Sequence, residues 1–192
     1  KQKLQLIFQK KRIAHAQLFN GKKGSGKLAL AVAYARLLNC TSEFCESCVK
    51  FSKLSHPDFH IIFPVIKTIT NKTPNSIDFL NKWKDEFLKN PYFSLDDWME
   101  VYKQQFLEKR SDKNKEPAIY SNQINEINRK LSLKIYSARY RIVLIWMPEK
   151  MNLQASNKFL KVLEEPPKKT IIILVSEDKS KLLNTIISRL QV

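Results

Sequence analysis

The eight residues Gly21-Lys22-Lys23-Gly24-Ser25-Gly26-Lys27-Leu28 follow the pattern G-x-x-x-x-G-K of a phosphate-binding loop. An apolar pair, Leu18-Phe19, precedes this stretch, and a run rich in alanine and leucine over residues 28–38 follows it. A strand, a glycine-rich turn and a helix, in this order, let backbone N–H groups converge on phosphate oxygens. All three glycines of the chain lie here, which argues against a chance turn. The stretch predicts a P-loop α/β fold.

Leu28 departs from this pattern, because a serine or threonine hydroxyl normally stands there as a magnesium ligand. The remaining loop still offers its backbone, and Lys27 would reach the outer phosphates. We therefore expect a degenerate site that acts as a phosphate cradle only. ATP or phosphate could bind to it, but hydrolysis is not expected. The residues of this cradle are Gly21, Gly24, Ser25, Gly26, Lys27 and Leu28.

The composition sets the broad class of the protein. A chain of 192 residues with 43% hydrophobic residues has the size of one α/β domain with room for an insertion. The net charge of +16 suggests an anionic partner such as nucleic acid, although scattered lysines also describe an ordinary solvated surface. No run reaches the roughly 18 apolar residues of a membrane span. The chain begins with Lys1 and stops just after an expected helix, so we expect a fragment of a longer protein.

The apolar patterns predict alternating strands and helices. Continuous apolar runs indicate buried strands of a parallel sheet, and helical spacing indicates amphipathic helices. A first helical face (Leu4, Ile7, Phe8) precedes the P-loop, and residues 109–115 are expected to form a charged loop. The expected strands cover residues 61–65, 141–146 and 170–175; the expected helices cover 28–38, 76–88 (capped by Ser76 or Asp78), 95–107, 120–133 and one capped by Asn152 that carries Leu153, Phe159 and Leu163.

Residues 67–118, called the 67–118 segment below, carry many aromatic residues near lysines. They can be interpreted as a stacking platform for single-stranded nucleic acid. They can also be interpreted as two helices that pack their aromatic faces inward, and the helical spacing favours this second interpretation. The aromatic and apolar positions of the two helices are Ile77, Leu80, Trp83, Phe87, Leu88, Trp98, Met99, Tyr102 and Phe106.

Three cysteines, Cys40, Cys45 and Cys48, follow the first helix. The C-x2-C spacing of the last two suits zinc, because two thiolates on one tight turn reach a tetrahedral ion together. A fourth cysteine is missing, and His56 or His60 could take its place. Alternatively, this stretch is a degraded zinc module that keeps only reduced thiols. His15 is better explained as a structural histidine before the first strand than as a ligand.

The end of the 141–146 strand is where an open α/β sheet places its chemistry. Nucleotide hydrolases hold magnesium and orient water with carboxylates there. Here Trp146 and Met147 occupy those positions, and neither can bind a metal or polarise water. Glu149 follows beyond Pro148, and we do not expect it to substitute.

Four further motifs support a family resemblance. They are His15-Ala-Gln-Leu-Phe before the P-loop, the cysteine pair followed by His56-Pro-Asp, Asn157-Lys-Phe-Leu-Lys-Val-Leu-Glu-Glu-Pro-Pro, and Thr185-Ile-Ile-Ser-Arg189. With them the chain resembles the AAA+ clamp-loader subunits of bacterial DNA polymerase III, and most closely the delta-prime group. The resemblance covers nearly the whole chain apart from the 67–118 segment.

This resemblance implies an α/β, RecA-like AAA+ core in which helices flank a parallel sheet. Residues 1–192 would form one AAA+ P-loop domain, with a zinc-module-like insertion at 40–57 and a mostly helical insertion at 67–118. The C-terminal lid and collar would lie outside this chain. The cysteines would bind zinc, Ser176 would stand at the sensor-1 position, and Arg189 would act in trans as an arginine finger. Leu190 replaces the cysteine of the Ser-Arg-Cys motif.

The resemblance further implies a cytoplasmic, non-hydrolysing stator subunit without intrinsic enzymatic activity, within a DNA polymerase holoenzyme. Its partners would be the gamma/tau and delta subunits and, through the complex, the sliding clamp and primer-template DNA; no membrane partner is expected. Two alternatives remain open at this point. One is an active clamp-loader ATPase of the gamma/tau type, and the other is a basic module that binds single-stranded DNA.

Overall fold

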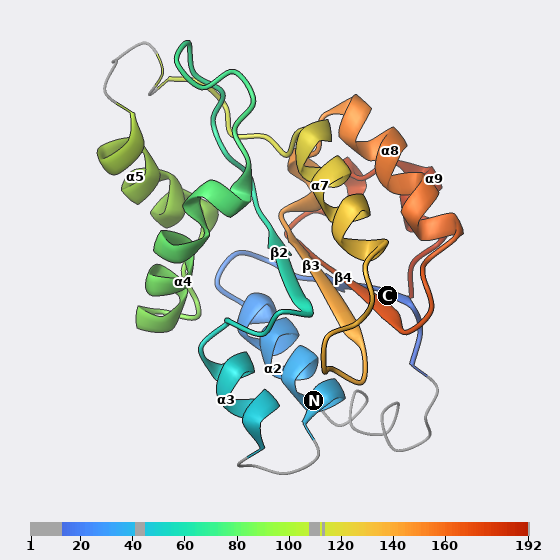
Figure 1. The fold of residues 1–192 in the computed structure, drawn as a ribbon. Coiled ribbons are helices and arrows are strands. Elements are labelled where there is room, and N and C mark those ends of the chain that lie inside the picture. Colours follow the sequence, from blue (N-terminus) through green and yellow to red (C-terminus); the bar gives the residue numbers. More distant parts are fainter. Residues whose placement is uncertain (1–12, 41–44, 108–111, 113, 192) are drawn as a thin grey trace.

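The computed structural model describes residues 13–40, 45–107, 112 and 114–191. The expected helical face of Leu4, Ile7 and Phe8 lies outside these residues, as does most of the expected 109–115 loop. The described chain forms a parallel sheet of β1 (Ala16–Asn20), β2 (Phe59–Ile62), β3 (Arg141–Trp146) and β4 (Thr170–Ser176), in the order β1-β4-β3-β2 (Figure 1). The predicted α/β class with a parallel sheet is confirmed.

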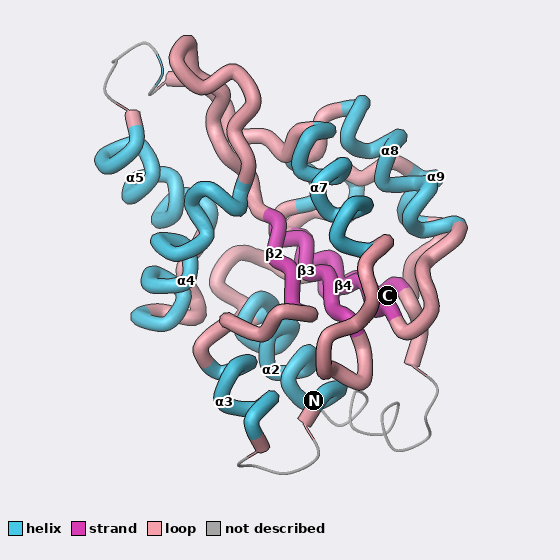
Figure 2. The backbone as a smooth tube through the Cα atoms, viewed as in Figure 1, coloured by secondary structure: helices cyan, strands magenta, loops and turns pink. Residues whose placement is uncertain are grey.

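Helices cover both faces of this sheet (Figure 2). The bounds of the helices are α2 (Lys27–Asn39), α3 (Glu46–Ser52), α4 (Leu80–Lys89), α5 (Leu95–Phe106), α7 (Ser121–Leu131), α8 (Leu153–Glu164) and α9 (Asn184–Ile187). The described residues also form three short 3-10 helices, η1 (Ser76–Phe79), η2 (Pro148–Lys150) and η3 (Lys179–Lys181). Helices α2, α3, α4 and α5 contribute to the hydrophobic core on one face, and α7, α8 and α9 contribute to the core on the other.

The two central strands divide their side chains between these two cores. Ile142 and Leu144 of β3 enter the core with α2, whereas Val143 and Ile145 enter the core with α8. Every residue of β3 and β4 is buried. Strands covered on both faces need apolar residues at consecutive positions, which is why both were predicted as continuous apolar runs.

Three details of the predicted elements are wrong. Strand β2 begins at Phe59 and ends at Ile62, before Pro64, whereas the apolar run predicted residues 61–65. The helical region after residue 75 is capped by the Asn75 side chain, which accepts a hydrogen bond from the N–H of Ile77, while Asp78 completes the capping box. Leu153 is 66% exposed and does not join the core, because it occupies the first position of α8.

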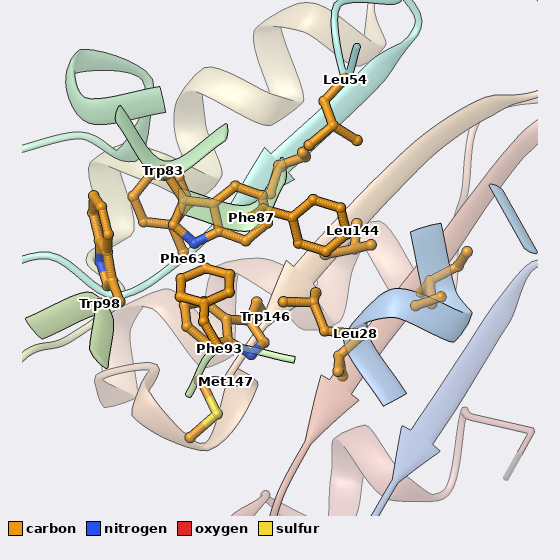
Figure 3. Close-up of a cluster of buried hydrophobic side chains, with 14 of the residues drawn as sticks. Leu28, Leu54, Phe63, Trp83, Phe87, Phe93, Trp98, Leu144, Trp146 and Met147 are labelled. Carbon is orange, nitrogen blue, oxygen red and sulfur yellow. The ribbon is translucent and has the colours of Figure 1, made fainter. Parts of the chain in front are cut away.

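Most aromatic residues of the 67–118 segment, among them Trp83, Phe87, Phe93 and Trp98, pack inward, as predicted (Figure 3). Trp83 and Trp98 are both 0% exposed. The ring of Trp83 stacks on Phe63 with centroids 5.3 Å apart and meets Trp146 of β3 edge-on at 5.7 Å. Rings enclosed in this way cannot stack on bases, so the single-strand-binding interpretation loses its platform. Three positions expected on the buried faces, Ile77, Leu88 and Phe106, are instead exposed.

Candidate functional site

The P-loop has the backbone that its glycines predicted. Gly24 and Gly26 have φ angles of 75° and 73°, a left-handed conformation that favours residues without a side chain. Gly26 is the N-cap of α2, so the loop leads directly into the helix N-terminus. Strand β4 positions the start of the loop, because the N–H of Gly21 donates to the carbonyl oxygen of Ser176 at the end of β4 (3.2 Å).

Lys27 is held by the protein itself. Its Nζ donates to Glu177 Oε1 at 3.2 Å and to the carbonyl oxygen of Lys22 at 3.1 Å, and the residue is only 9% exposed. The side chain that would reach a phosphate therefore has a carboxylate as its partner. Glu177 was missed by the sequence analysis, because nothing in its local pattern connects it with a loop 150 positions earlier.

The 67–118 segment packs against one end of the P-loop. Pro91, Tyr92 and Phe93 face the loop across a cavity of only ≈20 Å³, enough for about one water molecule. A Cβ atom placed on Gly26 would lie 2.8 Å from Cε1 of Tyr92. An ion pair between Lys23 and Asp96 at the start of α5 (2.5 Å) joins the segment to the loop. The predicted cradle is present as a backbone turn: Tyr92 packs on its Gly26 end, while residues 22–25 of the loop remain exposed.

The positions where hydrolases carry carboxylates are apolar here, as the sequence indicated. Trp146 is 2% exposed and Met147 is 4% exposed. Glu149 serves the backbone instead, since its Oε1 accepts from the N–H groups of Glu177 (2.7 Å) and Asp178 (3.4 Å). The Oγ of Ser176 accepts from the N–H of Asp178 at 3.2 Å. Both side chains thus fix the turn that follows β4.

Arg189 lies on the surface, just after α9. Its Nη2 forms an ion pair with Glu164 at the end of α8 (2.8 Å), and its Nη1 donates to the carbonyl oxygen of Thr185 (2.8 Å). The side chain keeps 37% of its surface exposed. The Leu-Glu-Glu-Pro-Pro and Ser-Arg motifs, which are far apart in the sequence, therefore meet in the structure. In the part of the chain that the structure describes, the side-chain hydrogen bonds of Arg189 go to Thr185, Ser188 and Glu164, and none goes to the P-loop.

The three cysteines come together as the zinc hypothesis requires. The sulfur atoms of Cys40, Cys45 and Cys48 all lie within 4.8 Å of one another. The N–H of Cys48 donates to the sulfur of Cys45 at 3.2 Å, which places both thiols on one turn at the start of α3. Burial and the neighbouring thiols raise the pKa of Cys40 to about 12. Three converging thiols fit zinc as three of its four ligands, and as thiolates they would hold the ion with soft donors.

Neither histidine offered as a fourth ligand belongs to this cluster. Within the described residues, the group that could hold a metal consists of the cysteines alone. His56 stacks on Phe51 with centroids 4.6 Å apart, and its Nδ1 accepts from the N–H of Asp58 at 3.1 Å. His60 lies in β2, where burial and the charges of Lys130 and Arg141 lower its pKa to about 4.

For the metal, we expect one zinc ion per chain, and weaker binding as the pH falls because the thiols must deprotonate. Loss of a hydrogen-bond partner of a metal ligand lowers metal affinity by roughly 10–100-fold. The Cys45→Ser variant loses a ligand itself, so its zinc affinity should fall by more than this. Competition with a chromophoric chelator measures this. The His56→Gln variant is the control and should keep wild-type affinity. A loss in that variant as large as in Cys45→Ser would contradict the three-thiolate site.

The Asp58 carboxylate organises the chain before β3. It accepts from the backbone N–H groups of Tyr136, Ser137 and Ala138 at 2.9–3.1 Å. Burial alone would raise the pKa of Asp58, but these donors outweigh it and hold the pKa below its ordinary value. The His56-Pro-Asp motif is thus a structural anchor beside the cysteines. From the sequence alone, this motif was noted only for the family resemblance, and its structural role was not predicted.

We expect Asp58→Asn to lower the free energy of unfolding by about 1–3 kcal/mol at pH 7, because a buried acceptor of several N–H groups is weakened. A carboxylate with a depressed pKa stabilises the fold above the unfolded pKa of about 3.9, and this contribution is lost as the pH falls through the lower folded pKa. The difference between variant and wild type should therefore shrink below about pH 4. Urea unfolding across this range measures it, with the exposed Asp85→Asn as control. Equal losses in both variants would contradict the anchor.

Comparison with known proteins places these features in a family. A family model described as DNA polymerase III, delta subunit, matches residues 1–192. The chain is 27% identical over 189 residues to the DNA polymerase III subunit delta' of Bacillus subtilis, covering 95% of this chain and 42% of that protein. The subunit delta' of Pseudomonas aeruginosa is 25% identical, with 92% and 41% covered. The subunit tau of Bacillus subtilis is 26% identical, with 98% and 26% covered.

The chain thus spans less than half the length of these relatives. None of the helices in the described part of the chain is long and apolar enough to cross a membrane.

Proposed function

Because the chain belongs to the family described as DNA polymerase III, delta subunit, we propose that it is a delta-prime stator of the clamp loader. In this role it supports ATP-dependent loading of the sliding clamp onto primed DNA. It does so in the cytoplasm, together with gamma/tau and delta subunits. Residues 1–192 would supply its AAA+ domain, with residues 40–57 and the 67–118 segment as insertions.

The observation that carries the proposal is the contrast between two sites. At the P-loop, Tyr92 packs on Gly26 beside a cavity of ≈20 Å³, and Lys27 already has Glu177 as its partner. Arg189, in contrast, is exposed and held at the surface by Glu164. A guanidinium that reaches an ATP bound by a neighbouring subunit stabilises the charge that develops in the transition state. The chain would therefore supply Arg189 to the ATP site of the neighbouring subunit and hydrolyse no nucleotide itself.

The active-ATPase alternative is tested with the purified chain. We expect no magnesium-dependent ATP turnover, and ATP affinity weaker than about 1 mM, which corresponds to only about 4 kcal/mol of binding free energy. Turnover assays and calorimetric titration measure the two quantities, with a gamma/tau subunit as positive control. Turnover that disappears in Lys27→Ala would overturn the stator assignment and favour an ATPase of the gamma/tau type.

Membership of the complex is tested by mixing the chain with gamma/tau and delta subunits from the same source. Co-elution of the three in size-exclusion chromatography is expected. Because this chain covers only 42% of the Bacillus delta' relative, the same test is made with the whole protein that the gene for this chain encodes. Failure of the whole protein to co-elute would rule out the assignment.

A further inference from the structure

A pocket of ≈470 Å³ lies along the open edge of the sheet, away from the P-loop and Arg189. It follows the outer side of β2, which is an edge strand, and is bounded by η1 and α4 on one side and α7 on the other. Five cationic side chains line it, against two carboxylates. One of these carboxylates, Asp58, is occupied by backbone N–H groups, and the other, Glu126, pairs with Arg129 at 2.8 Å.

Arg141 forms the buried end of this pocket. Arg141 is 3% exposed, and its Nη1 and Nη2 donate to the carbonyl oxygens of Leu131 and Leu133, respectively, at 2.8 Å each. Its Nε is buried and has no hydrogen-bond partner among the described residues. The guanidinium forms no ion pair with these residues either. A buried charge and an unpaired donor are both costly unless an anion compensates them.

Two lysines from different elements add to this surplus of positive charge. Burial lowers the pKa of Lys84 of α4, and the charge of Lys130 of α7 lowers it further. No hydrogen bond or ion pair holds Lys84 within the described chain, whereas Lys130 reaches Glu126 only at 3.9 Å. An anion between the two ammonium groups would relieve their repulsion.

We propose that this pocket, called the β2-edge pocket, binds a phosphate group carried by a nucleotide, either free or within a DNA strand. A phosphate monoester, as in a free nucleotide or at the 5′ end of a DNA strand, carries about −1.5 to −2 charges and three acceptor oxygens, so it matches the surplus of cations better than a single carboxylate does. The exposed apolar side chains of Leu133 and Tyr136 (60% and 73% exposed) line the mouth of the pocket and give a base a surface to pack on. The proposal does not depend on the clamp-loader assignment.

The three histidines of the chain report where a ligand binds. His56 and His60 line the β2-edge pocket, and His15 does not. In imidazole NMR spectra of the whole chain, dTMP should shift the His60 and His56 signals and leave His15 unchanged. Binding at the P-loop would leave His60 unchanged, and this result would overturn the proposal.

Calorimetric titration with dTMP then tests the cations. Removing two charge-assisted contacts in Lys84→Met/Lys130→Met should weaken binding by at least about tenfold. Lys161 is an exposed residue of α8 outside the pocket. The control variant Lys161→Met removes one lysine charge there and should bind dTMP like wild type. Thermal melting confirms that each variant is folded. Wild-type affinity in the double variant would overturn the proposal.

A final comparison identifies the source of the phosphate. If the natural ligand is a DNA strand, 5′-phosphorylated (dT)8 should bind more than tenfold more tightly than dTMP and shift the same histidine signals. Equal affinities would indicate a free nucleotide. If an oligoglutamate peptide shifts His60 at lower concentration than either nucleotide probe does, the pocket recognises carboxylates and the proposal is wrong.

Discussion

In a reconstituted clamp loader, Arg189→Ala should reduce ATP hydrolysis at the one adjacent ATPase site by about 10³-fold, the lower end of the range measured for arginine fingers. Steady-state turnover of the whole complex should fall by the share that this site contributes. The cause is the loss of a guanidinium aimed at the developing charge on the transferred phosphoryl group. Turnover by the complex, with and without clamp and primed DNA, measures the effect.

Two controls separate this role from a structural one. Arg189→Lys keeps the charge but loses the planar fork, so it should recover only part of the activity. Glu164→Gln removes the ion-pair partner of Arg189 (2.8 Å) and leaves the guanidinium in place. Since surface ion pairs contribute about 0–1 kcal/mol, this variant should unfold like wild type. Unchanged turnover in Arg189→Ala, with the complex intact, would exclude the finger.

The second large effect concerns the packing of the 67–118 segment. Trp83→Ala should lower the free energy of unfolding by about 3–5 kcal/mol, because it empties a fully buried site between Phe63 and Trp146. Tyr92→Ala, in the same segment but 63% exposed, is the matched aromatic control and should cost less than about 1 kcal/mol. Urea unfolding measures both.

The outcome of this comparison also decides what the aromatic residues are for. If they formed a stacking platform for DNA, Trp83→Ala would weaken DNA binding and leave stability unchanged. If Trp83→Ala and Tyr92→Ala destabilise the protein equally, the segment is not anchored to the sheet through its buried face.

The sequence predicted the elements whose signals are local. Strands β3 and β4 were recognised because burial on both faces requires consecutive apolar residues. The turn at Gly24 and Gly26 was recognised because only glycine adopts its left-handed angles without strain. Helix starts were less accurate, since Asn75 and Ser76 are equally good caps by type and only the fold selects between them.

The features that could not be predicted are contacts between distant parts of the chain. No local pattern connects Tyr92 with Gly26, Asp96 with Lys23, or Glu177 with Lys27, and no repeat or spacing places them together. The pairing of Glu164 with Arg189 is of the same kind, although both motifs were noted separately. The buried guanidinium of Arg141 was also missed, because in the sequence it is only the first residue of an apolar run.

The sheet also separates the two halves of the proposed role. Leu28, which follows the P-loop, belongs with Trp83 and Phe93 to the core on one face. Leu163 and Ile186, near Glu164 and Arg189, belong to the core on the other face, and Leu190 packs against that core. Substitutions that share no partner generally act independently. Substitutions that remove nucleotide hydrolysis at the P-loop could therefore accumulate on one face of the sheet without disturbing the proposed role of Arg189 on the other face.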